Sequence, residues 1–574
     1  MSENCESTDP RNIYTPIISY EHGAYHVPLL GESVQHCLFR VADRFPDREA
    51  LISIHQDRRF TYREIKKIVD NAAKAFLALG IGRGDRVAIW STNNYEWWVT
   101  QFATARIGAI LVTINPAYRT HELEYVLKKS NAKALLLIES FKTSNYVDML
   151  YKVCHEIKES VPGHIDSWRF PHLKSVIFIG TKQHPGMFTR REFAEMGPTM
   201  SDTELERVAH GLEIDDAINI QYTSGTTGYP KGVVLTNHNI INNAYLTALE
   251  MGLTHEDKLC MPVPLYHCFG MVLSSLSCVT VGAALVIPGP VFDVEETLRA
   301  VHQERCTALH GVPTMFIAEL EHPNFEKYDL TSLRTGIMAG APCPIDVMKK
   351  VHNRMNMKEI LIGYGQTECS PIATLTRPDD PLEKRISTVG KVAPHVELKV
   401  VDPETGWTLP RGAKGEICFR GYNVMRGYDN MPEATEEAVD EDDWLHSGDL
   451  GVMEQDGFVK ITGRLKEMVI RGGENLFPKE IEEFLRTLDL IYDVYVVGIP
   501  DERMGEELLA CVKLRKGVEA PKAEEFRAMC RGNIAHFKIP RYWLVVDEYP
   551  MTVTGKIQKF KLAEWGIREL GLVK

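Results

Sequence analysis

The sequence predicts an α/β protein with a large N-terminal domain of parallel-sheet βα layers plus a small β-barrel, followed by a small α+β C-terminal domain. Three observations predict this fold class. A chain of 574 residues is too long for one compact core, so two or more domains are expected. Up to about residue 380, short apolar runs alternate with helical patterns, which indicates βα units and largely parallel sheets. From residue 387, glycines punctuate short β-rich runs instead.

The elements of the large domain follow from these patterns in order. The expected strands are 86–90, 109–114, 134–138, 176–179, 217–221 and 359–362, and the expected helices are 62–79 and 122–129. The polar stretch 158–216 is expected to hold inserted loops. The stretch 259–292 lacks Asp, Glu, Lys and Arg, but its prolines and its middle rich in Ser and Thr favour a buried strand, loop, helix and second strand (283–287) over a membrane span.

The rest of the chain is expected to complete the barrel and to form the small domain. Runs 396–401 and 415–420 predict strands of a small barrel or distorted sheet over residues 387 to about 458. After Arg464, we expect helices 478–488 and 521–531 and strands 494–499, 508–514 and 542–546. The predicted domains are an N-terminal extension (1–32), a large domain (33–464) and a small domain (465–574).

Composition and charge exclude several classes of protein. Hydrophobic residues at 44% and charged residues at 25% are ordinary for a globular protein. A formal net charge of −13 argues against nucleic acid as the main partner. Twelve cysteines without a C-x-x-C pair fit reduced thiols and offer no zinc site by spacing. The first residues resemble neither a secretory signal nor a transit peptide, and the final GLVK is not a peroxisomal address.

The segment YTSGTTGYPKG (222–232) is the most informative motif in the chain. It holds three glycines, four hydroxyl side chains besides those of its two tyrosines, and Lys231, and a helical pattern begins near Thr236. Glycines let successive backbone N–H groups converge into an anion-binding nest, to which hydroxyls and lysine add donors. A Walker A loop carries lysine directly after its second glycine, whereas Tyr229 follows Gly228 here. The segment therefore suits triphosphate binding without being a P-loop.

This segment resembles the phosphate loop of the ANL superfamily, which comprises acyl-CoA synthetases, adenylation domains of peptide synthetases and luciferases. Segments 115–130, 471–482, 501–507 and 536–543 resemble medium-chain acyl-CoA ligases of the acyl-CoA synthetase family member 2 type. The resemblance implies activation of a fatty acid, medium-chain favoured, to acyl-AMP and then to acyl-CoA. ATP, Mg²⁺ and CoA would take part, and the small C-terminal domain would be mobile.

The resemblance also implies the residues of the nucleotide site. These are Thr223, Ser224, Gly225, Thr226, Thr227, Gly228, Lys231, Gly340, Ala341, Pro342, Tyr364, Gly365, Gln366, Thr367, Asp449, Arg464 and Lys556. Tyr364 would stack on adenine, and Asp449 would bind the ribose hydroxyls. Glu368 follows a predicted strand, where α/β proteins place ligand sites, and its carboxylate suits Mg²⁺. Glu368 and Thr226 are the expected metal ligands.

Four residues are expected to act in catalysis, namely Lys556, Thr226, Glu368 and His267. By resemblance, Lys556 would swing in to bridge the acyl carboxylate and the α-phosphate. His267, in the segment PLYH, would line the passage between the acyl pocket and the CoA entry.

The small domain is expected to rotate between the two half-reactions. By resemblance, Lys466 would be the hinge, and Gly472 and Gly473 would approach the active site on the CoA side in the thioester-forming orientation. Lys538 and Lys559 are expected to be solvated or to contact CoA phosphates.

Four other functions share parts of this pattern. An acyl-AMP ligase that loads a carrier protein often has an insertion after the hinge, whereas Lys466 runs directly into EMVIRGGEN. An aryl-acid CoA ligase and a luciferase-type oxygenase share the adenylation motifs. A non-catalytic sensor would be expected to lose Lys556, Glu368 or Asp449, and all three are present. The expected partners are small molecules, and the expected location is the mitochondrial matrix by resemblance, with the cytosol as the alternative.

Overall fold

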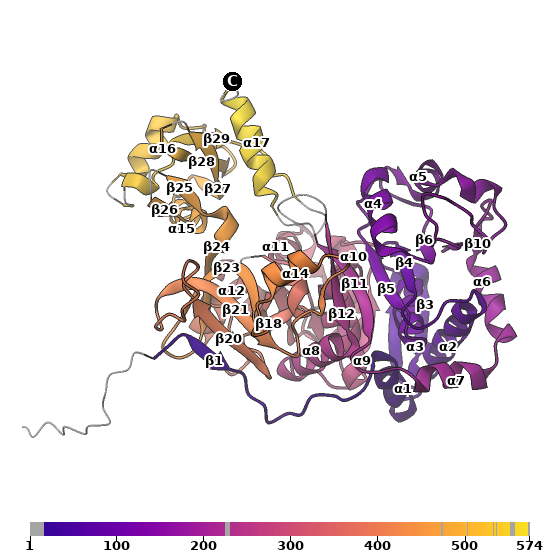
Figure 1. Ribbon diagram of the computed structural model, residues 1–574. Helices are drawn as coiled ribbons and strands as arrows, with labels where there is room; N and C mark the ends of the chain where they lie inside the picture. Colours follow the sequence, from indigo (N-terminus) through magenta and orange to yellow (C-terminus); the bar gives the residue numbers. More distant parts are fainter. Residues whose placement is uncertain are drawn as a thin grey trace, which may run out of the picture.

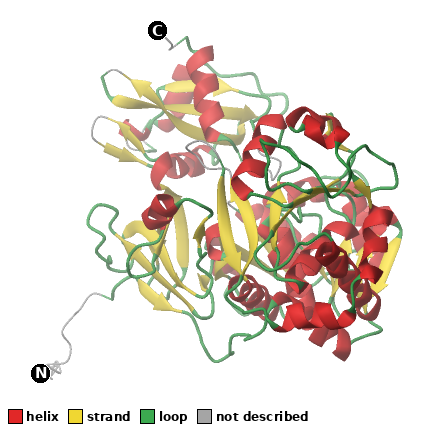
Figure 2. Ribbon diagram, turned by 45° about the vertical axis from the view of Figure 1, so that its right-hand side comes forward, coloured by secondary structure: helices red, strands yellow, loops and turns green. Residues whose placement is uncertain are grey.

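The computed structural model describes residues 17–223, 230–341, 343–471, 474–501, 503–531, 533–534, 536–551 and 557–571. Two large sheets with helices around them form the main body, and a five-stranded sheet adjoins them (Figures 1 and 2). A C-terminal α+β unit, orange to yellow in Figure 1, lies beyond the five-stranded sheet. This arrangement confirms the α/β class and the order of a large part followed by a small one.

The first large sheet has eight strands in the order β10-β9-β6-β4-β5-β11-β12-β22. Its strands from β10 to β11 are parallel, and the last two pairings are antiparallel. Strands covered on both faces read as continuous apolar runs, as in β5. The bounds are β10 (Phe188–Thr189), β9 (Ser175–Phe178), β6 (Ala134–Leu137), β4 (Arg86–Trp90), β5 (Ile110–Ile114), β11 (Ala217–Thr223), β12 (Lys231–Thr236) and β22 (Gly427–Tyr428).

The second large sheet has nine strands in the order β19-β18-β17-β16-β15-β13-β14-β2-β3. Its strands from β17 to β2 are parallel, and the pairings at both ends are antiparallel. The bounds are β19 (Lys391–Val392), β18 (Ile372–Leu375), β17 (Glu359–Gly365), β16 (Thr335–Ala339), β15 (Ala308–Leu309), β13 (Lys258–Cys260), β14 (Ala284–Ile287), β2 (Glu49–Ser53) and β3 (Arg58–Thr61).

Helices pack on these sheets, and their ends follow local capping. Thr61 and Thr189 form capping boxes with Glu64 and Glu192 at the starts of α2 and α6. The helices of this part are α1 (Val34–Arg44), α2 (Tyr62–Ala78), α3 (Tyr95–Arg106), α4 (Thr120–Ser130), α5 (Tyr146–Val153), α6 (Arg190–Met196), α7 (Asp202–His210), α8 (Asn237–Glu250), α9 (Ser277–Val281), α10 (Val294–Glu304), α11 (Pro313–Leu320), α12 (Ile345–Arg354), α13 (Leu382–Ser387) and α14 (Pro432–Ala438).

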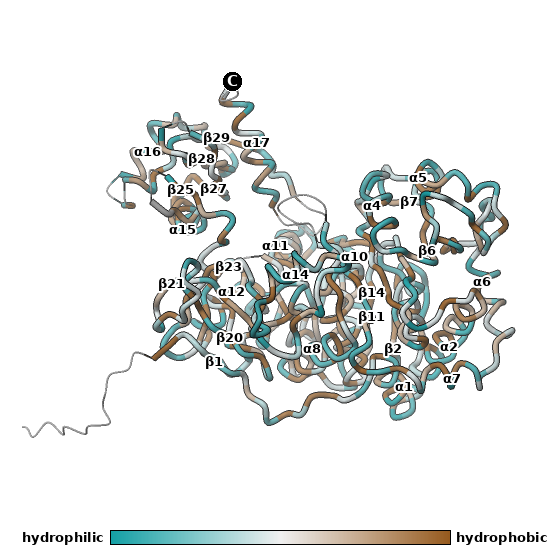
Figure 3. The backbone as a smooth tube through the Cα atoms, viewed as in Figure 1, coloured by the Kyte–Doolittle hydropathy of each residue, from teal (hydrophilic) through white to brown (hydrophobic). Residues whose placement is uncertain are grey.

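One hydrophobic core joins the two large sheets. It includes Ile89 of β4, Leu285 of β14, Ile241 of α8 and Met271 of the π-helix η4 (Phe269–Leu276), so helices lie between the sheets. Figure 3 shows hydrophobic residues along the central strands and many hydrophilic residues on the outer helices. The core therefore holds the two sheets in a fixed relation, which positions the strand ends that form the candidate site.

The five-stranded sheet is antiparallel, in the order β1-β20-β21-β23-β24, and is the distorted sheet expected from residue 387 onward. Its first strand comes from the start of the chain, since β1 pairs with β20 (Figure 1). The bounds are β1 (Tyr20–His22), β20 (Val396–Val401), β21 (Lys414–Gly421), β23 (Leu445–Met453) and β24 (Val459–Arg464).

The C-terminal unit contains the helices and strands expected there. Strands β26, β25, β28 and β27 form its sheet, and β29 pairs parallel with β28. The bounds are β25 (Val469–Arg471), β26 (Glu474–Leu476), α15 (Pro478–Leu485), β27 (Ile491–Asp501), β28 (Gly505–Leu514), α16 (Ala523–Cys530), β29 (Tyr542–Val545) and α17 (Lys559–Glu569).

Two parts of the chain hold more regular structure than expected. The stretch 158–216 contains the expected loops and the expected strand β9, together with β10, α6 and α7, which were not predicted. The helix expected near Thr236 begins at Asn237, and the unpredicted β12 precedes it and returns antiparallel to β11. The unpredicted elements are polar or short, which hides their periodicity. The charge-free stretch 259–292 forms β13, η4, α9 and β14 as expected, and among the described residues no helix combines the length and apolar character that a membrane span needs.

Candidate active site

The hairpin of β11 and β12 frames the phosphate segment. Thr223 and Lys231 form its last register pair, and the Thr223 hydroxyl lies 3.4 Å from the Lys231 carbonyl oxygen. The Lys231 ammonium lies 4.6 Å from the ring centroid of Tyr428, a cation–π contact. The lysine side chain is thus held at the start of β12, directly after the phosphate segment.

Tyr428 connects this lysine to the expected metal ligand. Strand β22 pairs with β12, which places Tyr428 opposite Val233. The Tyr428 hydroxyl donates a hydrogen bond to Glu368 Oε1 over 2.8 Å. Burial, and then the charge of Glu368, raise the pKa of Tyr428, so the phenol keeps its proton and stays a donor. Lys231, Tyr428 and Glu368 therefore form one chain of contacts.

Glycines let the motif after β17 pack closely. A Cβ added at Gly365 would lie 1.9 Å from the Pro371 carbonyl oxygen, so a side chain is excluded there. Gly340 follows β16, the neighbour of β17, and has a φ of +87°, which favours glycine. The register pairs Ala339 with Gly363, so Gly340 and Ala341 follow β16 next to the end of β17. Gln366 is half-buried, and Thr367 is buried.

Asp449 joins two of the expected nucleotide residues. Its Oδ2 accepts a hydrogen bond of 2.7 Å from the Tyr364 hydroxyl, and its Oδ1 accepts one of 2.8 Å from Arg464 Nε. Asp449 and Arg464 are register partners of β23 and β24. Burial, and then the charge of Asp449, raise the pKa of Tyr364 well above its ordinary value. Asp449 is 4% exposed, and the two hydrogen bonds fix the orientation of its carboxylate.

A buried asparagine on another loop holds the segment before His267. Asn93 donates to the Val263 carbonyl over 3.0 Å and accepts from the Leu265 N–H over 2.8 Å, which shapes the segment before His267. His267 Nδ1 accepts the Phe269 N–H over 3.2 Å. Its neighbour Cys268 is buried and donates its thiol to Gln221 Oε1 over 3.0 Å. His267 itself is half-buried at the start of η4.

The expected hinge lies in a single 3₁₀ turn, Leu465–Glu467, where Lys466 is exposed. The turn is tied to the small domain by Lys559, whose ammonium lies 2.9 Å from both Glu467 and Glu482. Lys559 is therefore ion-paired rather than solvated, which corrects one of the two alternatives expected from the sequence; the other, contact with a CoA phosphate, stays a prediction. Lys538 forms an ion pair with Glu480.

Several expected residues lie outside the described residues, and their positions stay predictions. They are Ser224, Gly225, Thr226, Thr227, Gly228, Pro342, Gly472, Gly473 and Lys556. Two contacts of the site had no signal in the sequence. Tyr428 is 60 residues from Glu368, and Lys559 follows Lys556 in a segment that reads as an exposed basic run.

Comparison with known families agrees with this geometry. Residues 38–429 match the AMP-binding enzyme family, and residues 480–556 match the AMP-binding enzyme C-terminal domain. The chain belongs to the AMP-binding enzyme family. The resemblance to the ANL superfamily drawn from residues 222–232 is thereby confirmed.

Relatives of this AMP-binding enzyme cover nearly its whole length. The putative acyl-CoA synthetase YngI of Bacillus subtilis is 50% identical over 95% of this chain and 99% of its own. The proteins named medium-chain acyl-CoA ligase ACSF2, mitochondrial, are 45% identical in Danio rerio and 42% identical in Homo sapiens. Both matches cover 98% of this chain. They cover 93% of the Danio rerio protein and 92% of the Homo sapiens protein.

Solved structures share the fold of this AMP-binding enzyme. The anthranilate CoA ligase AuaEII in complex with anthranoyl-AMP superposes with a TM-score of 0.81 at 25% identity over 95% of this chain and 99% of its own. ATP-bound MatB from Rhodopseudomonas palustris gives a TM-score of 0.77 at 27% identity over 94% of this chain and 100% of its own.

Proposed function

We propose that this AMP-binding enzyme activates a fatty acid, with medium chains favoured, to acyl-AMP and pyrophosphate, and then forms acyl-CoA and AMP. The carrying observation is that the end of β17 and the turn after it supply one residue, Tyr364 or Glu368, to each of two contact groups. Lys231, Tyr428 and Glu368 form one, and Tyr364, Asp449 and Arg464 form the other. The names of the relatives, acyl-CoA synthetase and medium-chain acyl-CoA ligase, support the choice of acid and acceptor.

In the first half-reaction, a carboxylate oxygen attacks the α-phosphorus, and the bond to the leaving pyrophosphate breaks. Two anions must approach each other, so cationic and N–H groups are needed to offset their repulsion. Lys231 and Lys556 would supply charge, and Thr223, Ser224, Gly225, Thr226, Thr227 and Gly228 would surround the phosphates. Asp449 would hold the ribose, with Arg464 and Tyr364 fixing its carboxylate.

The oxygen ligands for a hard cation fit Mg²⁺. Glu368 presents a half-buried carboxylate whose Oε1 is oriented by the Tyr428 hydroxyl, and Thr226 is the second expected ligand. When bound, Mg²⁺ neutralises phosphate charge. The role of Tyr428 would be to orient the Glu368 carboxylate through its hydrogen bond and not to bind the ion itself.

In the second half-reaction, the CoA thiol sulfur attacks the acyl carbonyl carbon, and the bond to AMP breaks. The small domain would rotate about Lys466, remove Lys556 and bring Gly472 and Gly473 to the CoA side. The short 3₁₀ turn at Leu465–Glu467 is a connection with few residues to reorient, which suits a hinge. The domain boundaries proposed for this motion are 33–464 and 465–574.

One experiment separates the medium-chain proposal from its alternatives. Pyrophosphate release is measured with ATP and Mg²⁺ for straight-chain acids from acetate to palmitate and for aromatic acids such as anthranilate. We expect a maximum at medium chains. A maximum with aromatic acids would instead favour an aryl-acid CoA ligase. The similarity to the structure of an anthranilate CoA ligase is the reason for including these acids. Pyrophosphate release without thioester formation would favour loading of a carrier protein.

The mitochondrial matrix is proposed as the location only by analogy with the vertebrate relatives, which are named mitochondrial. The bacterial relative YngI supports the alternative of a cytosolic enzyme. Cell fractionation with antibodies to the full chain distinguishes the two locations.

A further inference from the structure

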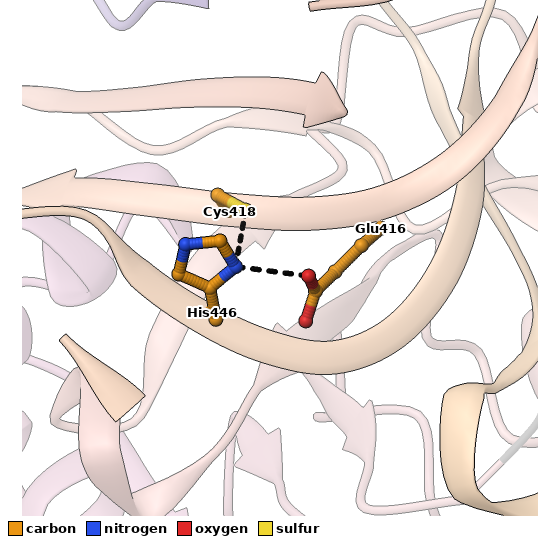
Figure 4. Close-up of side chains that lie close together, drawn as sticks. All are labelled: Glu416, Cys418 and His446. Atoms are coloured by element: carbon orange, nitrogen blue, oxygen red, sulfur yellow. Dashed lines mark hydrogen bonds and ion pairs between the residues drawn. The ribbon is translucent and has the colours of Figure 1, made fainter. Parts of the chain in front are cut away.

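Three potential metal ligands converge between β21 and β23, in the five-stranded sheet (Figure 4). His446 Nδ1 lies 2.9 Å from Glu416 Oε2 and 3.5 Å from Cys418 Sγ. One ligand atom of each residue lies within 4.8 Å of the other two. The proposed reaction uses none of these side chains.

A bulge in the sheet creates this convergence. Cys418 and His446 are register partners, and two residues earlier Glu416 pairs with Leu450. The five residues of β23 from His446 to Leu450 therefore lie against only three residues of β21, from Glu416 to Cys418. Because side chains two apart share one face of a strand, Glu416 and Cys418 both point at His446. Figure 4 shows all three side chains directed into the same space.

Contacts outside the cluster orient two of its three members. The Gly448 N–H donates to Glu416 Oε1 over 3.0 Å, which leaves Oε2 facing His446. The far nitrogen of His446, Nε2, lies 3.5 Å from Asp440 Oδ2. Metal-binding histidines commonly have a carboxylate at the second ring nitrogen, which fixes the ring and increases its basicity. Asp440 occupies this position at His446 Nε2.

Burial and charge favour a cation in this space. Cys418 is fully buried, Glu416 is 7% exposed, and the His446 side chain is 31% exposed, so one side is open to water. Two carboxylates, Glu416 and Asp440, face the imidazole. Lys399, the register partner of Cys418 in β20, and Arg420 lie over the Trp444 ring at 4.2 and 4.6 Å from its centroid.

A proton is the competitor for the metal. Hydrogen bonds to Cys418 and then to Glu416 raise the pKa of His446 to about 10, and burial raises the pKa of the Cys418 thiol. A metal must displace both protons to the solvent, so its affinity increases with pH.

We propose that Glu416 Oε2, Cys418 Sγ and His446 Nδ1 bind one zinc-type divalent cation, with water as the fourth ligand on the open side of His446. Zinc binds thiolate at about 2.3 Å and imidazole or carboxylate at about 2.0–2.2 Å. The observed donor separations of 2.9 and 3.5 Å need to change by only a few tenths of an ångström to surround such an ion. A set with sulfur and nitrogen donors does not suit Mg²⁺.

The test titrates the full-length protein, purified and treated with chelator, with Co²⁺ alone as a spectroscopic probe for zinc. We expect one equivalent to bind with visible d–d bands of a tetrahedral ion and a sulfur-to-cobalt charge-transfer band. Zinc should displace the cobalt and abolish both, whereas excess Mg²⁺ should leave them unchanged. Isothermal titration in buffers of different ionisation enthalpy should report protons released on binding.

Matched variants locate the site. Cys418→Ser should remove the charge-transfer band, and His446→Gln should weaken binding about tenfold or more. Cys511→Ser is the control, because Cys511 is also buried in a strand but lies in the small domain. If Cys418→Ser does not fold, Glu416→Gln keeps the thiol and should keep the band with affinity reduced about tenfold or more. Absence of stoichiometric binding, or wild-type affinity in Glu416→Gln or His446→Gln, would overturn the proposal.

Discussion

The Tyr364 hydroxyl donates a hydrogen bond to Asp449 Oδ2 across 2.7 Å, which joins β17 of the nine-stranded sheet to β23 of the five-stranded sheet. Arg464 Nε binds the other oxygen of the same carboxylate. Two residues proposed for the nucleotide site therefore hold each other in place before any ligand binds. Preorganised groups of this kind avoid the cost of ordering them during the reaction.

The first prediction concerns Asp449. Asp449→Asn should raise the KM for ATP by about 10–100-fold, because a hydrogen bond to a charged group contributes about 1.5–3 kcal/mol. The measurement is pyrophosphate release at varied ATP with saturating acid. Tyr364→Phe is the control, since it removes only the hydroxyl and leaves the Arg464 contact, and its effect should be smaller. An unchanged KM in Asp449→Asn would show that this carboxylate does not hold the ribose.

The second prediction concerns Glu368. Glu368→Gln should increase the Mg²⁺ concentration needed for half-maximal pyrophosphate release by about tenfold, because an amide oxygen is a weaker ligand for a hard cation. Tyr428→Phe removes the hydrogen bond to Glu368 and keeps the carboxylate, so a smaller shift is expected. If Glu368→Gln and the wild type have the same Mg²⁺ dependence, Glu368 is not a ligand.

The third prediction concerns Glu319, which is buried in α11 with Oε2 lacking a hydrogen-bond partner among the described residues. Burial raises its pKa to about 8. The folded protein holds a proton that the unfolded chain releases near its ordinary pKa of about 4.3. The protonated Glu319 carboxyl therefore contributes its full stabilisation of the folded state below about pH 4, and this contribution is lost as pH rises towards about 8.

Glu319→Gln removes this titration while keeping the shape of the side chain. Thermal unfolding from about pH 5 to about pH 9 should show wild-type stability falling relative to this variant as pH rises. Glu321→Gln, at an exposed position on the same segment, is the control and should follow the wild type. Parallel curves for wild type and Glu319→Gln would contradict the assignment of a neutral buried carboxyl.

The fourth prediction concerns Lys559, which binds Glu467 at the proposed hinge and Glu482 in α15. Lys559→Met should leave the buried Glu482 carboxylate without this cation, and loss of one partner of a buried pair costs about 3–5 kcal/mol. Hydrogen exchange should become faster across α15 and α17. Lys561→Met, at an exposed position two residues later, should change neither helix. Equal protection in wild type and Lys559→Met would mean that this ion pair does not stabilise the unit.

Sequence reasoning succeeded where local patterns are strong. The strand now called β4 was predicted with its observed bounds, because a four-residue apolar run after Arg86, between polar segments, leaves little choice. Tyr364, Asp449 and Arg464 were expected at one nucleotide site, and the structure places these three side chains in contact. Their role in nucleotide binding stays a prediction. Asp449 contacts Arg464 because β23 pairs with β24. The fifteen-residue spacing in the sequence is compatible with this pairing but does not require it.

Contacts between distant segments could not be predicted in this way. Tyr428 reaches Glu368 because β22 adds a short strand to the edge of the eight-stranded sheet, and a two-residue strand has no periodicity to detect. His446 and Cys418 meet across a bulge, so their spacing in sequence resembles no zinc motif. Lys559 appeared to be a solvated charge because the carboxylates that pair with it lie on other elements.

The central claim is that one site performs acid activation and thioester formation. The most direct measurement incubates the full chain with ATP, Mg²⁺, octanoate and CoA, and quantifies all nucleotide and acyl products by mass spectrometry. We expect AMP, pyrophosphate and octanoyl-CoA in equal amounts, and octanoyl-AMP bound to the protein when CoA is omitted. Formation of ADP and phosphate, or of AMP without any thioester, would contradict the account.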